Sequence, residues 1–327
     1  SSSSDSDQVT QRRANLEALK ALGVAVYPGS FKIEAGVSSL VNEHGASDSE
    51  ALETAKLETR TAGRILSIRS FGKANFLVIS DGRFKIQLYI RQDELSDRDF
   101  QLFKLLDFGD WIGVEGTLFR TRTKELTIRA SSLTFLAKCL LPLPEKWHGL
   151  QDIETRYRQR YLDLIVNPDS RRVFEIRSNA ISVMREFLVS RGFLEVETPM
   201  MQPIAGGALA RPFITHHNAL DMKLYMRIAP ELYLKRLTVG GIERVFEINR
   251  NFRNEGISTQ HNPEFTMLEF YLAYADYRDL MLLTEELFTE VISRTLGKDE
   301  VIFGEHKISF NAPFARVSLR ESAAEAA

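Results

Sequence analysis

The chain has 327 residues, of which 44% are hydrophobic and 26% are charged, and its formal net charge at pH 7 is only −2. This composition supports folded domains, about two by length, and excludes a highly charged disordered chain. No run of about 18 uninterrupted apolar residues is present, so we expect no membrane-spanning helix. The single cysteine, Cys139, excludes a disulfide framework within one chain and favours a reducing, cytoplasmic location.

Charge is distributed unevenly along the chain. Residues 60–138 contain 14 basic and 9 acidic side chains, whereas residues 1–59 carry a net charge of −4 and residues 139–327 a net charge of −3. A basic surface favours phosphate-bearing partners, because neutralising phosphates releases their counterions. A solvated surface that is merely richer in arginine explains the count equally well, so charge alone leaves both interpretations open.

Residues 1–59 are predicted to form a polar leader, an amphipathic helix and a linker. The first ten residues are rich in serine and acidic residues, lack the apolar stretch of a secretory signal and favour an irregular leader. From residue 11, leucines recur at helical spacing until Gly23, which predicts the end of that helix. These leucines are Leu16, Leu19 and Leu22.

Residues 60–138 are typical of a small OB-type barrel, because five short strands are predicted with one helix after the third. The strands are expected at 61–67, 76–79, 84–90, 110–119 and 125–135, and the helix at 95–106. Asp81-Gly82 is a turn signal, and the strand after it alternates, with Phe84, Ile86, Leu88 and Ile90 on one face.

The outward face of this barrel offers charge and stacking surface, from Arg69, Phe76, Lys85 and Gln87. The open face of such barrels commonly binds oligonucleotides. A barrel that only packs on its neighbour is the alternative, and composition does not decide between the two.

Residues 139–155 are predicted to be a linker, stiffened by the run LPLP at 141–144. The run RYRQRY at 156–161 follows. It is basic and aromatic, and an exposed helix face is as good an interpretation as a nucleic-acid contact.

Residues 156–327 are predicted to form a second, α+β domain. We expect helices at 171–191 and from Pro230 to Leu237, strands at 193–196, 222–228, 245–253 and 264–272, a further helix through Leu280 and Val291, and a hairpin about Gly304. On the strand at 264–272, Phe265, Met267, Glu269 and Tyr271 share one face. Burying charges beside such a strand without a function costs several kcal/mol, so a ligand site is favoured over a structural network.

Several motifs, in order, resemble class II aminoacyl-tRNA synthetases in the form found in lysyl-tRNA synthetase. The runs FRNEG at 252–256 and HNPEFTMLE at 261–269 are similar to motif 2, and FLEVETP at 193–199 is similar to motif 1. The runs RPF at 211–213 and APELYLK at 229–235 also resemble the lysine enzyme. The resemblance implies an N-terminal OB-fold barrel that binds the anticodon and a catalytic domain on an antiparallel sheet with flanking helices.

The resemblance also implies a reaction, in which ATP activates L-lysine to lysyl-adenylate and the lysyl group passes to tRNA(Lys). Arg253 is the implied catalytic residue, and the implied ATP-binding set is Arg253, Glu255, His261, Asn262 and Phe265. The implied lysine-binding residues are Gly207, Glu231, Glu269 and Tyr271, and the implied anticodon-binding residues are Arg69, Phe76, Gln87 and Glu125. A homodimer through motif 1 is expected as well.

Motif 3, a glycine-rich segment with an adenine-stacking arginine, does not occur before Ala327. The acidic Mg²⁺ ligands of the family are also expected downstream of that residue, so we expect no metal site within this chain. We therefore expect a fragment of a longer enzyme with an incomplete catalytic domain. The rival hypotheses are a truncated, catalytically impaired protein that binds tRNA or a partner, and a ligase that aminoacylates a protein, against which the barrel argues.

Overall fold

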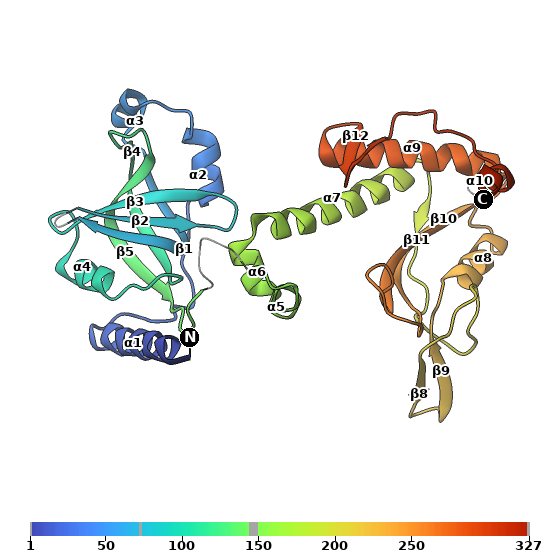
Figure 1. Cartoon of the computed structure of the whole chain (residues 1–327), viewed down its shortest axis with the longest axis horizontal. Coiled ribbons are helices and arrows are strands. Elements are labelled where there is room, and N and C mark those ends of the chain that lie inside the picture. Colours follow the sequence, from blue (N-terminus) through green and yellow to red (C-terminus); the bar gives the residue numbers. More distant parts are fainter. Residues whose placement is uncertain (1, 72–73, 144–149, 326–327) are drawn as a thin grey trace. The chain divides into compact units, whose positions relative to one another are not determined.

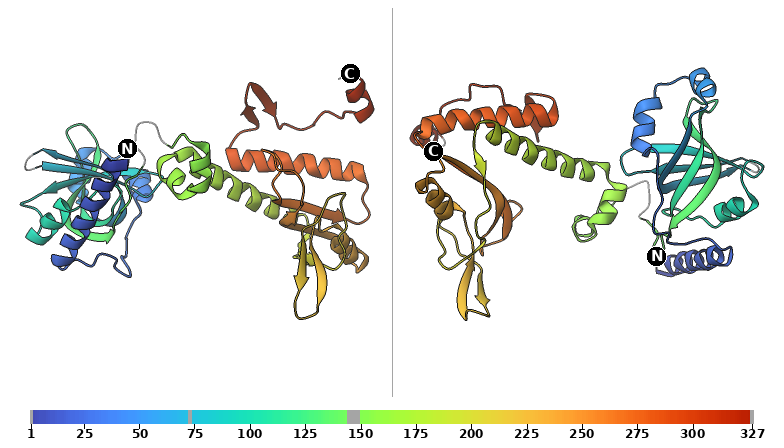
Figure 2. Two further views of the ribbon diagram at one scale, coloured as in Figure 1. Left: turned by 60° about the horizontal axis from the view of Figure 1, so that its bottom comes forward. Right: turned by 180° about the vertical axis from the view of Figure 1, so that it is seen from behind.

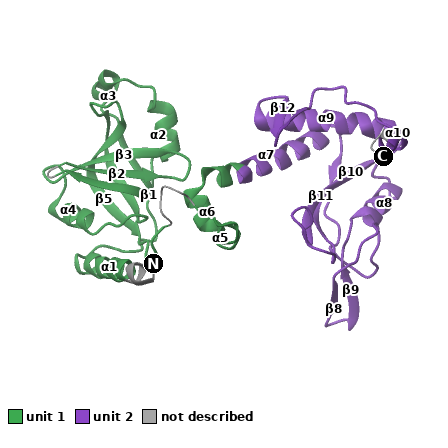
Figure 3. Cartoon of the chain, viewed as in Figure 1, with its two compact units in different colours: residues 1–172 green, residues 173–327 purple. Residues whose placement is uncertain are grey.

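The computed structural model describes residues 2–71, 74–143 and 150–325 (Figure 1). The chain forms two compact units, residues 1–172 and residues 173–327 (Figure 3). The first unit is built on a β-barrel, and the second combines small sheets with helices. The predicted α+β class is therefore confirmed.

Five strands close the barrel in the order β1-β2-β3-β5-β4. They are β1 (Glu58–Phe71), β2 (Ala74–Ser80), β3 (Lys85–Arg91), β4 (Trp111–Arg120) and β5 (Leu126–Ala137), and α4 (Asp97–Lys104) follows the third strand as predicted. Alternate residues point inward, so that Leu77, Ile79, Ile86 and Leu88 are buried in the barrel core. The OB-type prediction is thus confirmed.

The prediction for Phe84 is wrong, because this residue lies before β3 and is 38% exposed. The carboxylate of Asp81 accepts the backbone N–H groups of both Arg83 and Phe84 at 3.0 Å, and Gly82 adopts a positive φ of 93°. The turn therefore extends through Phe84, and the strand begins one residue later than its apolar pattern suggested.

Helix α1 (Ser2–Ala21) corrects the expectation of an irregular leader, because residues 2–10 are already helical. Leu16 and Leu19 are buried as predicted. Two short helices follow in the predicted linker, α2 (Val37–His44) and α3 (Ser49–Ala55). Packing of the downstream half of α1 on the barrel overrides the weak helix preference of its serine-rich start.

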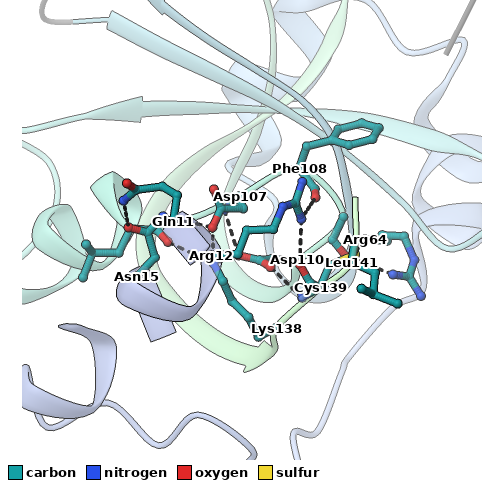
Figure 4. Close-up of polar contacts among 12 residues, drawn as sticks. Gln11, Arg12, Asn15, Arg64, Asp107, Phe108, Asp110, Lys138, Cys139 and Leu141 are labelled. Atoms are coloured by element: carbon teal, nitrogen blue, oxygen red, sulfur yellow. Dashed lines mark hydrogen bonds and ion pairs between the residues drawn. The ribbon is translucent and has the colours of Figure 1, made fainter. Parts of the chain in front are cut away.

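Arg12 and Lys138 tie α1, the start of β4 and the end of β5 together (Figure 4). The Arg12 guanidinium donates to the carbonyl oxygens of Phe108 and Cys139, at 2.8 and 2.6 Å. The Lys138 ammonium lies 2.5 Å from Asp107 and 2.8 Å from Asp110, and the side chains of Lys138 and Asp110 are fully buried. Burial raises the pKa of Asp110, and hydrogen bonds from Lys138, Cys139 and Asp107 oppose that rise.

Replacing Lys138 with methionine is expected to destabilise the first unit by about 3–5 kcal/mol, because it leaves the buried Asp110 carboxylate without its cation. Urea unfolding measures this loss. The matched control is Lys20→Met, which removes an exposed partner of Glu17 and is expected to cost about 0.5 kcal/mol or less. Equal effects of the two substitutions would contradict this account of the Lys138 cluster.

The basic, aromatic run at 156–161 lies in two short helices, α5 (Ile153–Arg158) and α6 (Arg160–Val166), before the long helix α7 (Pro168–Ser190). Its arginines are engaged in ion pairs. Arg156 and Arg160 both contact the buried Asp163, and Arg158 pairs with Glu154. Burial opposes the ionised form of Asp163, but hydrogen bonds with Ser170 and Asn167, and then with the two arginines, hold its pKa below the usual range. Part of the predicted LPLP linker, Pro144, falls outside the described residues.

The second unit centres on a three-stranded sheet in the order β11-β10-β6 (Figure 2). Strands β10 (Arg244–Phe252) and β11 (Glu264–Leu272) are antiparallel, whereas β6 (Leu194–Glu195) runs parallel to β10. Helices α7 and α9 (Tyr277–Leu296) cover one face of the sheet, where their side chains pack on Phe246 and on Leu268, Phe270 and Leu272 of β11. Helix α8 (Glu231–Val239), bounded by Pro230 and Gly240 as expected, lies against β10 and β11.

A second small sheet is formed by β7 (Met201–Gln202), β9 (Met222–Met226) and β8 (Ile214–His217), of which only β9 was predicted. Strands of two and four residues carry too little periodicity to be recognised. The β8–β9 hairpin projects from the unit, on the side away from α9 (Figures 1 and 2). The predicted hairpin about Gly304 is present as β12 (Glu300–Phe303) and β13 (His306–Ser309), and α10 (Leu319–Glu325) follows.

Candidate active site and nucleic-acid interface

A groove of about 920 Å³ runs over the outer surface of the barrel. Its lining includes all four residues proposed for the anticodon, Arg69, Phe76, Gln87 and Glu125. Phe76 and Val78 of β2 point into the groove, whereas their neighbours Leu77 and Ile79 point into the core. Lys85, expected on the same face, is exposed but is not among the lining residues.

The groove joins aromatic rings that pack edge-on or tilted against one another to positive charge. The ring centroid of Phe76 lies 5.1 Å from that of Tyr89 and 6.3 Å from that of Phe71. The Arg129 guanidinium lies 4.9 Å from the centroid of the Phe119 ring. Sequence reasoning did not single out Tyr89, Phe119 or Arg129, although the alternation of β3 places Tyr89 beside Gln87. Unstacked bases bind to such aromatic and guanidinium surfaces.

The sheet face opposite α7 and α9 carries the residues predicted for lysine. The Tyr271 hydroxyl donates to Glu269 Oε1 at 2.9 Å. Burial raises the pKa of Glu269, as do the nearby charges of Glu231 and Glu247, while the Tyr271 hydrogen bond and the Lys235 charge lower it. Burial and the Glu269 carboxylate raise the pKa of Tyr271, so this phenol stays a hydrogen-bond donor. The pair offers an anionic, partly desolvated acceptor.

Glu231 and Gly207 lie together at the start of α8. Gly207 has a positive φ of 92°, and a Cβ atom there would come within 3.0 Å of Glu231 Cβ and 3.3 Å of Ala229 Cβ. A side chain at this position would therefore strain the backbone and crowd Glu231. The Glu231 carboxylate accepts from the Lys235 ammonium one helical turn later, at 2.5 Å.

A buried polar network beneath this face was not predicted. Glu247 pairs in register with Glu269 and is 1% exposed. Its carboxylate lies 2.7 Å from Arg227 Nη1 and accepts the Thr198 hydroxyl at 2.6 Å. Because Glu247 is neutralised by the fully buried Arg227, Glu269 is the carboxylate left available on this face. A lone arginine within the apolar run at 222–228 was the only sequence signal of this network.

Arg253 and Phe265 meet at the ends of β10 and β11. The Arg253 guanidinium lies 5.2 Å from the centroid of the Phe265 ring, and the Arg253 backbone N–H donates to the Pro263 carbonyl at 2.9 Å, which closes the loop between the strands. Within the described part of the chain, Arg253 Nε is buried and has no hydrogen-bond partner. A guanidinium that stands over an aromatic ring and keeps one buried N–H free can bind a ligand that carries negative charge close to a flat aromatic group.

The loop between these strands holds the remaining predicted ATP residues. Glu255 accepts the backbone N–H of Arg211 at 3.3 Å, which ties the loop to the run at 211–213. His261 Nδ1 lies 2.9 Å from the Ser258 hydroxyl, and both His261 and Asn262 are exposed. All five residues of the predicted ATP set therefore lie in or beside one loop.

Over residues 2–71, 74–143 and 150–325, no group of three or more histidine, cysteine or acidic side chains is arranged to hold a metal ion. No helix among these residues is long and apolar enough to cross a membrane.

Two family models match the two parts of the chain. One for OB-fold nucleic acid binding domains covers residues 59–136, and one for class II tRNA synthetases (D, K and N) covers residues 152–326. The chain belongs to the class II tRNA synthetases of the D, K and N group. The family resemblance drawn from motifs 1 and 2 is therefore confirmed.

Curated relatives of the chain include the heat-inducible lysine–tRNA ligase of Escherichia coli K12, 54% identical over 317 residues. The lysine–tRNA ligases of Shigella dysenteriae serotype 1 and Yersinia enterocolitica are both 53% identical, over 317 and 316 residues. The matches cover 97, 97 and 96% of the chain and 63, 63 and 62% of the respective relatives. The chain thus spans less than two thirds of the length of these relatives.

Proposed function

We propose that the protein is a lysine–tRNA ligase, which activates L-lysine with ATP and transfers it to tRNA(Lys). The observation that carries the proposal is the anionic pair of Glu269 and Tyr271, with Glu231 nearby, on the same sheet face as Arg253 and Phe265. A selective site for lysine must replace the water around an ammonium with anionic oxygens. An aspartate site would need a free cation there, but Arg227 and Lys235 are both paired with glutamates.

In the proposed reaction, an oxygen of the lysine carboxylate attacks the α-phosphorus of ATP. The bond to pyrophosphate breaks as the lysyl-adenylate anhydride forms. Arg253 would bridge the carboxylate and the α-phosphate, where negative charge develops, and Phe265 would stack on adenine. Glu255, His261 and Asn262 would hold the rest of the nucleotide. No side-chain base is needed, because the carboxylate is already ionised.

Lysine would lie with its side-chain ammonium at Glu269 and Tyr271 and its α-amino group at Glu231, while Gly207 leaves room for its backbone. Mg²⁺ is proposed as a partner of ATP, as is typical of this family, where it would neutralise charge on the phosphates.

We assign anticodon binding to the barrel, residues 60–138, and catalysis to residues 156–327. Residues 1–59 form the leader, helix and linker before the barrel, and residues 139–155 link the two domains. Val189 of α7 and Leu194 of β6 are more than half exposed in the single chain, which supports a homodimer through motif 1. We place the reaction in the cytoplasm, where tRNA, lysine and ATP occur together.

We expect the full-length protein to charge tRNA(Lys). The Phe76→Ala substitution is expected to weaken tRNA binding by about 1–3 kcal/mol, because one base of the anticodon loses its stacking partner. Lysine-dependent pyrophosphate exchange, which needs no tRNA, should be unchanged. The matched control is Phe84→Ala, an exposed ring outside the groove.

Filter binding and charging kinetics with the purified protein test this assignment. Unchanged tRNA affinity in a folded Phe76→Ala variant would contradict the role of the groove. Tight tRNA binding by the wild-type protein without any charging would support the catalytically impaired alternative.

A further inference from the structure

Ser258 lies in the loop between β10 and β11, three residues before His261, and its hydroxyl oxygen has three polar neighbours. The backbone N–H groups of Gln260 and His261 donate to Ser258 Oγ at 3.2 and 3.1 Å. The third neighbour is Nδ1 of the His261 ring, at 2.9 Å. The loop is further closed by backbone hydrogen bonds between Ser258 and His261 in both directions, at 3.2 and 3.3 Å.

These contacts fix which atom carries the proton between the two side chains. A serine hydroxyl has two acceptor positions and one hydrogen. Backbone N–H groups can only donate, so Gln260 and His261 use both acceptor positions of Ser258 Oγ. The contact with the ring must therefore be made by the serine hydrogen, with Nδ1 of His261 as its acceptor.

The neutral His261 ring then carries its own hydrogen on Nε2, because the tautomer of a histidine is set by the bond that its other nitrogen makes. The His261 side chain is exposed, and its Nε2 has no hydrogen-bond partner among the described residues. The ring therefore keeps one donor available for a ligand. Phosphate and ribose oxygens of a nucleotide can accept that donor.

We propose that Ser258 is a positioning residue, which holds His261 in the Nε2–H tautomer so that the ring donates a hydrogen bond to an acceptor oxygen of ATP. The identity of this ligand rests on the proposed function, whereas the tautomer rests on the loop alone. Without the serine hydroxyl, Nδ1 loses its donor, and the ring divides between two tautomers of which only one suits the nucleotide.

Two serine variants test the proposal. Nitrogen-15 NMR of the His261 ring, at a pH where the ring is neutral, should show a protonated Nε2 and an unprotonated Nδ1 in the wild-type protein. Ser258→Ala should give an averaged pair of ring-nitrogen signals and raise the ATP KM roughly 2- to 10-fold, because the ring loses both its fixed tautomer and the hydrogen bond that holds its orientation. The lysine KM should stay unchanged, and Ser258→Thr, which keeps a hydroxyl, should restore both readouts.

The outcomes separate this inference from the proposed function. Protonation of Nδ1 in the wild-type ring would overturn the role of Ser258, as would an unchanged tautomer in Ser258→Ala, and either result would leave the ATP site standing. An unchanged ATP KM in His261→Ala would instead overturn the assignment of His261 to ATP. The wild-type spectrum decides the tautomer even where the alanine variant does not fold.

Discussion

Arg253→Ala is expected to reduce lysine-dependent ATP–pyrophosphate exchange in the full-length protein by at least roughly 10²–10³-fold, the usual effect of removing a preorganised donor from developing charge. The guanidinium stands over the Phe265 ring with its Nε buried and, within the described residues, unpaired. The donor is therefore already in place and already desolvated before any ligand binds. Alanine removes both the positive charge and the two-pronged grip on phosphate and carboxylate oxygens.

The control for this experiment is Arg250→Ala, on β10 three residues before Arg253. Arg250 is exposed and pairs with Glu264 at 3.4 Å, on the face opposite Arg253 by strand alternation. Its loss should leave exchange within about twofold of the wild-type rate, since exposed pairs contribute little. Exchange by Arg253→Ala within a few-fold of wild type would remove Arg253 from the catalytic role.

Glu269→Gln is expected to weaken lysine binding by roughly 2–5 kcal/mol, because a desolvated ammonium loses its charged partner. The ATP KM should change far less. Glu264→Gln is the matched control, since Glu264 lies on the same strand but on the opposite face, paired with Arg250. Calorimetry with L-lysine measures the difference, and unchanged affinity in a folded Glu269→Gln protein would end the assignment to lysine.

The pKa of Glu269 adds a pH dependence to this prediction. Burial raises that pKa, so as pH falls the carboxylate protonates earlier than an ordinary glutamate, and lysine affinity should fall with it. Glu269→Gln should lose that part of the pH profile. The same shift makes the charged form costly to the fold, so stability should rise as pH falls through the raised pKa, and Glu269→Gln should unfold at a higher temperature than the wild-type protein.

Alternation along single strands was enough to predict which side chains share a face on both candidate surfaces. In β2 it separates Phe76 from Leu77, and in β11 it separates Glu269 and Tyr271 from Leu268 and Phe270, because side chains alternate faces whatever the strand packs against. Glu269, the charged residue in the interior of β11, lies on the open face. The motif resemblance then supplied the roles of Arg253 and of the loop that follows it.

Features that depend on contacts between distant segments could not be predicted. The pairing of Arg227 with Glu247 and Thr198 joins three separate segments of the second unit, and an arginine in the run at 222–228 does not say which distant residues it meets. The helical start of α1 likewise depends on Arg12 reaching Phe108 and Cys139. The serine-rich composition of residues 2–10 instead favoured an irregular segment.

The most direct test of the central claim is pyrophosphate exchange by the full-length wild-type protein with lysine, aspartate or asparagine as the only amino acid. These are the three amino acids of the family to which the chain belongs. We expect exchange with lysine and none above background with the other two, because the carboxylates of Glu269 and Glu231, with the Tyr271 hydroxyl beside Glu269, would face the two amino groups of lysine. Exchange with aspartate or asparagine, or with none of the three, would contradict it.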